Sequence, residues 1–157
     1  MGSRTAVAGL SVASLSLSER TLLWSMRVWV AGLVRPELAA ADQMAAALAD
    51  LRAAHATAYL DGFMWALRHG ATRTIGIDCP CQPGLDADER ALLDVFALAQ
   101  HGGGMEAAML LRAMVSPAAS RAALDSAERL GRALAAAGAI LVLPDRPSLA
   151  MFGLSAK

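Results

Sequence analysis

Cysteine, lysine and aromatic residues are all scarce in this chain of 157 residues. Two cysteines are too few for a small disulfide-rich scaffold. Lys157 is the only lysine, and the 14 basic and 14 acidic residues cancel, so the sequence lacks the concentrated positive charge of a phosphate-binding surface. We therefore expect no nucleic acid partner. Aromatic residues make up only 4% of the chain, which leaves leucine, methionine, valine and alanine to fill the core.

Long uninterrupted apolar runs are also missing. The longest, Thr21 to Val34, contains Arg27 and is shorter than the roughly 20 residues of a membrane span. The run from Ala6 to Leu17 is broken by Gly9 and several serines, and it lacks the leucine-rich centre of a signal peptide. We expect a cytoplasmic protein with no membrane span, in which residues 1–15 form a flexible or loosely docked arm.

Alanine-rich segments with helical spacing make up most of the chain. The hydrophobic fraction is 56%, above the roughly 45–50% of a typical soluble domain, and much of the excess is alanine, which favours helix. Ser16-Leu-Ser-Glu19 and Asp86-Ala-Asp-Glu89 are capping-box patterns, and Ser116-Pro117 is a typical helix start. These patterns predict three helix starts, with the first helix ending near Val34 and the last near Gly138.

The boundaries between these helices are less clearly marked. Pro36 fits the first turn of a second helix, and helical spacing continues up to Gly70, a typical stop signal. The spacing leaves open whether residues 36–69 form one helix or two. Gly102 to Gly104 end the helix that starts near Asp86, and a shorter helix is expected over Met105 to Val115.

Together these segments predict an all-α fold. Residues 16–143 are expected to form a single irregular or orthogonal bundle of five to six helices. The extended character of residues 74–78 and 139–143 suggests a minor two-stranded patch. Residues 144–157 are interrupted by proline and glycine and are expected to form a C-terminal tail.

The ten residues from Thr74 to Pro83 are the least helix-like, and they hold both cysteines. A single proline separates Cys79 from Cys81. With His69 before them and His101 after them, they supply the four ligands of a tetrahedral zinc site. Their spacing is tighter than the usual two to four intervening residues, so zinc stands beside two other interpretations. These are reduced cysteines packed as small hydrophobes, and a redox pair.

Thiol reactivity depends on nearby charge. Asp78 adjoins Cys79 and is expected to raise its pKa, while Arg73 is the nearest cation in the sequence. No pair of acid and base groups and no activated nucleophile stands out elsewhere, so the sequence does not favour an enzyme.

Three charged residues lie within otherwise apolar helical segments: Arg27, Asp61 and Arg68. A buried charge without a partner is unfavourable by several kcal/mol. We therefore predict a partly buried charge network, with ligand anchoring by Arg27 or Arg68 as the alternative.

Tryptophan is the residue type that points to an interface. Trp24 and Trp29 are five residues apart on one predicted helix and cannot both face the same way, so one of them is expected at a protein interface. The apolar excess and zero net charge favour a non-enzymatic helical protein–protein interaction module that self-associates as a homodimer. The alternative is a zinc-binding structural or sensor protein that uses Cys79 and Cys81.

Overall fold

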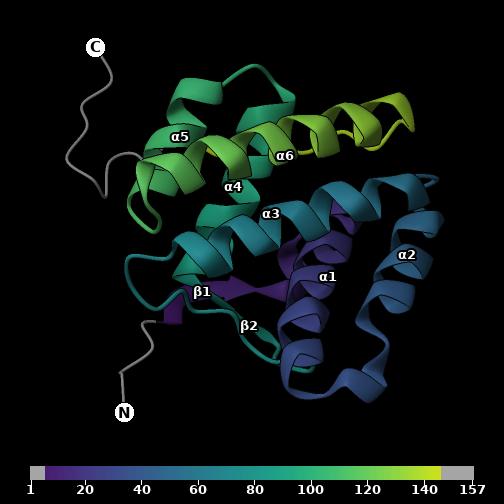
Figure 1. Ribbon diagram of the computed structural model, residues 1–157. Coiled ribbons are helices and arrows are strands. Elements are labelled where there is room, and N and C mark those ends of the chain that lie inside the picture. The colour runs from purple at the N-terminus through teal and green to yellow at the C-terminus, as the bar shows by residue number, and fades with distance from the viewer. Residues whose placement is uncertain (1–5, 146–157) are drawn as a thin grey trace.

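The computed structural model describes residues 6–145, with side chains from Leu10 onward. Within that range, the predicted all-α bundle is confirmed, with six α-helices and one small antiparallel sheet (Figure 1). The helices are α1 Leu17–Val34, α2 Ala40–Asp50, α3 Thr57–Gly70, α4 Ala87–Gln100, α5 Gly104–Arg112 and α6 Pro117–Ala136. The strands are β1 Ala6–Ser11 and β2 Gly84–Asp86.

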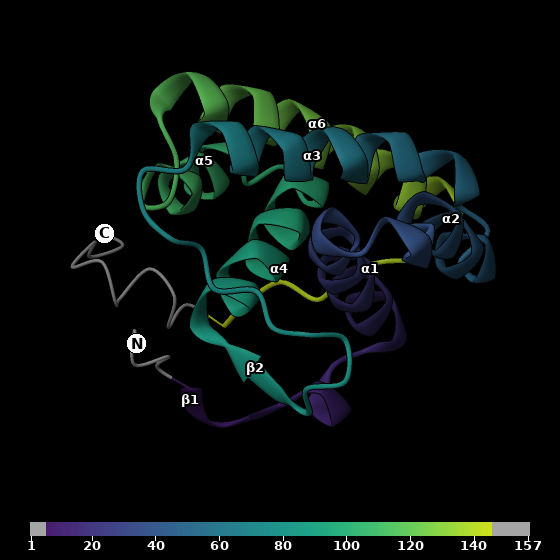
Figure 2. The same cartoon turned by 60° about the horizontal axis from the view of Figure 1, so that its bottom comes forward.

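Helices α3 and α6 lie side by side along one side of the molecule, and the small sheet lies on the other side of α1 and α4 (Figure 2). Glycines let α3 and α6 approach closely. A Cβ atom built on Gly70 would overlap the Cβ of Ala119, and one on Gly62 would lie 3.2 Å from the Ser126 hydroxyl. Gly70, at the end of α3, meets Ala119 near the start of α6, whereas the earlier Gly62 meets the later Ser126, so the two helices run antiparallel.

The core lies between these helices and α4. Its centre holds Phe63 of α3 and Phe96 of α4, whose ring centroids are 4.5 Å apart. Both rings are fully buried, as are Met26 of α1 and Leu130 of α6. The scarcity of aromatic residues thus leaves one aromatic pair at the centre, with leucine and methionine packed around it.

The helix starts agree with the capping patterns. The Ser16 hydroxyl accepts a hydrogen bond from the Glu19 backbone N–H, and Ser116 accepts one from Ala119. At α4 the capping box is complete, because the Glu89 side chain also bonds back to the backbone N–H of Asp86. These caps satisfy amide groups that have no partner within a helix.

Residues 36–69 form two α-helices. Pro36 begins a short 3-10 turn, Pro36–Leu38, and α2 starts after Ala39, which adopts a left-handed conformation with φ 47°. Arg52, at φ 60°, ends α2 in the same way. Non-glycine residues carry no strong sequence signal for this conformation, so the break could not be placed from the sequence.

The two-stranded patch forms from other residues than expected. β1 pairs with β2, whereas residues 74–78 and 139–143 are not strands. Backbone N–H groups in the first segment bond to carboxylates at the start of α4, and Leu141 of the second donates to the Gln100 side chain. Side chains thus take the bonding positions that a neighbouring strand would occupy.

The ends of the chain are described only in part. The predicted arm of residues 1–15 contributes β1 and a 3-10 turn at Val12–Ser14. Most of the predicted tail, residues 146–157, lies outside the described residues. Within residues 6–145, no helix is both long and apolar enough to cross a membrane.

Candidate functional site

Glu89 of α4 organises the segment that carries the cysteines. Its side chain is fully buried, and each of its two carboxylate oxygens accepts two hydrogen bonds. Oε1 accepts from Arg27 Nε at 2.7 Å and from the backbone N–H of Asp78 at 2.9 Å. Oε2 accepts from the Arg27 guanidinium at 2.8 Å and from the backbone N–H of Asp86 at 2.9 Å. One buried side chain therefore joins α1, the start of α4 and both ends of the residues between Asp78 and Asp86.

Arg27 of α1 completes this arrangement from the other side. Its remaining N–H groups donate to the carbonyl oxygens of Gln82 at 2.6 Å and Gly84 at 2.8 Å. Burial by itself would lower the pKa of Arg27, but the hydrogen bond and charge of Glu89 outweigh it and raise the pKa above its ordinary value. The guanidinium stays charged and holds the backbone on the far side of the cysteines.

Arg27, Asp61 and Arg68, which were predicted to form one charge network, therefore have separate partners. Arg27 pairs with Glu89, while Asp61 accepts a hydrogen bond from Trp29 and Arg68 lies over the ring of Trp65. The capping-box pattern identified Glu89 as a helix-start residue, but nothing in the sequence linked it to Arg27.

A second clamp lies just upstream of the cysteines. Arg73 donates two hydrogen bonds of 2.8 Å to the two carboxylate oxygens of Asp88, which also accepts from the backbone N–H of Gly76. Burial disfavours the charge of Asp88, yet the bonds from Arg73 and Gly76 outweigh this and hold its pKa below the ordinary value. Acidic residues in the first turn of α4 thus anchor an otherwise irregular segment, where the helix dipole also favours them.

Residues 78–83, here called the cysteine loop, contain a tight turn. The carbonyl oxygen of Cys79 accepts a hydrogen bond of 3.1 Å from the N–H of Gln82, with Pro80 at the second of the four turn positions. Proline is favoured at that position because its fixed φ matches the φ that a β-turn requires there. Both cysteines are exposed and reduced, and their sulfur atoms are 3.2 Å apart.

The two thiols differ in acidity. The pKa of Cys79 is lowered, first by a hydrogen bond from the Cys81 thiol, and further by backbone N–H groups and the positive charge of Arg27. The same interaction with Cys79 raises the pKa of Cys81. The expectation that Asp78 would leave Cys79 with a raised pKa is therefore wrong, and the cation that acts on it is Arg27 rather than Arg73.

The four expected zinc ligands are not brought together. His101 lies at the C-terminal end of α4, where its Nε2 contacts the Leu141 carbonyl oxygen at 2.7 Å. The cysteine loop is held at the other end of this 14-residue helix, about 21 Å long. His69 stacks on Trp65 with ring centroids 5.2 Å apart. In residues 6–145, no three His, Cys, Asp or Glu side chains gather in a way that would hold a metal ion.

The tryptophans are arranged differently from the expected interface. Trp29 is buried, with 7% of its surface exposed, and its indole N–H donates to Asp61 at 2.8 Å. Trp24 is partly buried. Trp65 of α3 is the exposed tryptophan, at 39%, and packs edge-on against Trp29 with centroids 5.1 Å apart. Which tryptophan reaches the surface depended on how α1 and α3 pack.

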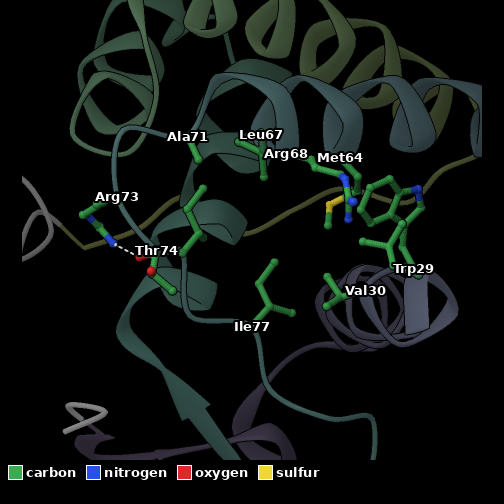
Figure 3. Close-up of a pocket in the computed structure, with 11 residues that line it drawn as sticks. Trp29, Val30, Met64, Leu67, Arg68, Ala71, Arg73, Thr74 and Ile77 are labelled. Atoms are coloured by element: carbon green, nitrogen blue, oxygen red, sulfur yellow. Dashed lines mark hydrogen bonds between the residues drawn. The ribbon is translucent and has the colours of Figure 1, made fainter. Parts of the chain in front are cut away.

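A cleft of about 220 Å³ opens beside these tryptophans, between α1, α3 and the segment that leads to the cysteine loop (Figure 3). Its walls are mainly apolar, with two arginines. The lining residues are Trp29, Val30, Leu33, Met64, Leu67, Arg68, Ala71, Arg73, Thr74, Ile75 and Ile77. No family model matches the sequence, and no curated protein or solved structure shows significant similarity to the chain.

Proposed function

We propose that this protein is a non-enzymatic helical interaction module that self-associates as a homodimer through the exposed stripe of α3. The observation that carries the proposal is the order of side chains on that stripe. Asp61, Trp65 and Arg68 are all exposed and lie at positions i, i+4 and i+7, so they share one face of the helix. An acid lies at one end, a cation at the other, and the exposed tryptophan between them.

This order is complementary to itself. In a two-fold dimer the same patch faces its own copy, and two copies of α3 that cross antiparallel place Asp61 against Arg68 of the partner subunit. Seven residues span about 10.5 Å of helix, which leaves the two tryptophans near the symmetry axis. Both ion pairs then flank a central aromatic contact from which water is excluded, the usual arrangement of an interface hot spot.

The neighbouring charges support this pairing. Within residues 6–145, no ion pair joins Arg68 to a carboxylate, and its guanidinium lies 5.8 Å from the centre of the Trp65 ring. Leu33, which lines the cleft with Arg68, and Val34 are exposed at 37% and 83%. These two residues extend the apolar surface of the stripe toward the end of α1.

A cytoplasmic location is part of the proposal. Two exposed thiols stay reduced where glutathione and thioredoxin systems maintain them. The interface itself requires no oxidised cysteine.

Charge reversal and mixing test the dimer. We expect sedimentation velocity to show a dimer for the wild type at high micromolar concentration, and monomers for Asp61→Arg and Arg68→Glu separately, because each variant places like charges opposite each other. A one-to-one mixture of the two variants should restore a dimer, since the opposite charges then face each other at both ends. Restoration also shows that both variants are folded.

Asp125→Arg serves as the matched control, because Asp125 is an exposed acid on α6 and its reversal should leave the dimer intact. Trp65→Ser should weaken the dimer more than either charge change alone. A wild type that sediments as a monomer would refute self-association. A mixture that stays monomeric while the wild type dimerises would move the interface to another face.

A further inference from the structure

We propose that Cys79 and Cys81 form a redox-active dithiol that reduces disulfides, with Cys79 as the attacking thiol and Cys81 as the resolving thiol. The inference does not depend on the dimer. It rests on the turn that brings the sulfurs together, the buried clamp behind that turn, and the exposure of both thiols.

The turn holds the two sulfur atoms almost at bonding distance. They are 3.2 Å apart, and a disulfide of about 2.05 Å forms when they approach by a little more than 1 Å. Pro80 restricts the backbone between them, and the hydrogen bond from Gln82 to the Cys79 carbonyl closes the turn. The proline that makes the spacing unfavourable for a zinc knuckle therefore favours a pair of neighbouring thiols.

The buried clamp keeps the turn in place. Glu89 holds the backbone just before Cys79, through the N–H of Asp78. Arg27 holds the backbone just after Cys81, through the carbonyl of Gln82. Because both flanks are fixed by residues in the core, forming or breaking the sulfur–sulfur bond requires movement only within the exposed turn.

The two thiols are unequal in a way that assigns their roles. The backbone N–H groups of Cys81 and Gln82 at the turn both donate to the sulfur of Cys79, and its pKa is lowered while that of Cys81 is raised, so we assign the attack to the Cys79 thiolate. Both residues are exposed, so a disulfide in solution has access to them.

The reaction balances as two thiol–disulfide exchanges. The Cys79 thiolate attacks one sulfur of a substrate disulfide, forms a mixed disulfide and releases the first substrate thiolate. The Cys81 thiolate then attacks the Cys79 sulfur, forms the Cys79–Cys81 disulfide and releases the second. Two electrons pass from the dithiol to the substrate, and the protons of the two cysteines end on the two released thiols.

Equilibration with glutathione buffers tests the pair. We expect acid-quenched intact-protein mass spectrometry to show loss of two hydrogen atoms as the proportion of glutathione disulfide rises, with no glutathionylated wild type accumulating. Because the bond spans only one intervening residue and is exposed, an excess of reduced glutathione should reverse it. A wild type that stays reduced in excess glutathione disulfide, or that gains two glutathionyl groups or forms intermolecular disulfides instead, would refute the proposal.

Single serine variants test the order of attack. Cys81→Ser should accumulate one stable mixed disulfide with glutathione, because the resolving thiol is missing. Cys79→Ser should form its adduct more slowly at pH 7, because the thiolate of Cys81 accepts from one backbone N–H group, whereas that of Cys79 accepts from two. Equal rates in the two variants would overturn the assigned roles. Both side chains are exposed, so far-UV circular dichroism of the two variants should match that of the wild type.

Discussion

Arg27 and Glu89 are 62 residues apart in the sequence, yet they form an ion pair of 2.7 Å with side chains only 2% and 0% exposed. The pair connects α1 to the start of α4. Both partners also form hydrogen bonds with backbone groups around the cysteine loop, so each charged side chain has polar partners besides the other. The ion pair therefore supports the backbone on both sides of the cysteines.

Removing one partner of this pair should strongly destabilise the fold. Arg27→Met leaves the Glu89 carboxylate buried without its cation, and the carbonyl oxygens of Gln82 and Gly84 lose their donors. We expect the free energy of unfolding in urea to fall by about 3–5 kcal/mol. Arg129→Met removes an exposed ion pair with Asp125 and should change it by less than about 1 kcal/mol. Similar effects of the two substitutions would show that the buried pair is not structurally important.

Gly70 should tolerate no side chain. Gly70→Ala forces a Cβ atom against that of Ala119 at the point where α3 and α6 approach closely. Overpacking of this kind costs about 1–3 kcal/mol. The double variant Gly70→Ala with Ala119→Gly removes the overlap and should recover much of the loss in thermal unfolding. Failure of the second substitution to recover stability would mean that the contact with Ala119 is not the cause.

Asp88 and Asp86 should affect acid stability in opposite directions. The pKa of Asp88 is lowered in the fold, so its ionised form stabilises the protein above the unfolded pKa of about 3.9, and this contribution disappears as the pH falls through the lower folded pKa. Asp88→Asn should therefore reduce stability at pH 7 and matter progressively less below about pH 4.

The pKa of Asp86 is shifted in the opposite direction, so its effect on stability has the opposite dependence on pH. Burial raises its pKa, and the neighbouring carboxylates of Asp88, Glu89 and Asp78 add to that rise. Its ionised form therefore opposes folding, increasingly as the pH rises from the unfolded pKa through the folded one. Asparagine is an equally good helix cap, so Asp86→Asn should stabilise the protein at pH 7 and have little effect at pH 3. The changes in urea midpoint of the two asparagine variants should have opposite signs at pH 7, and both should be smaller at pH 3; matching signs at pH 7 would contradict the assignment.

The N-terminal cap of α6 makes a smaller, local contribution to the free energy of unfolding. Ser116→Ala removes the hydroxyl that accepts from Ala119, so one amide at the start of α6 loses its partner. We expect a loss of about 1 kcal/mol in the free energy of unfolding. Ser14→Ala, which removes an exposed hydroxyl bonded to the Ser11 carbonyl, is a suitable comparison and should have a smaller effect.

Features set by residues close in sequence could be predicted well. The helices that begin after Ser16, Asp86 and Ser116 follow from caps in which the interacting atoms are three residues apart or fewer. Gly70 shows the limit of that reasoning. As the last residue of α3, it matched a typical helix stop, but its backbone φ is not left-handed, and close contact with α6 gives it its structural role.

The candidate site depended on long-range packing and was predicted only in part. The cysteine segment was identified because it is the least helix-like stretch and holds both cysteines. The structure does not place its expected histidine partners beside it, because His101 lies at the far end of the helix whose start holds the loop. Arg27 and Trp65 gained their roles only when α1, α3 and α4 packed together, and no local pattern carries that information.

The two amide groups that Glu89 holds, those of Asp78 and Asp86, lie at either end of a solvent-exposed segment. Each must break its hydrogen bond to this buried carboxylate before its hydrogen exchanges with water. In native-state hydrogen exchange, both should be protected as strongly as amides in the middle of the bundle. We therefore expect the exposed turn between them to be attached at both ends to a part of the molecule that opens rarely.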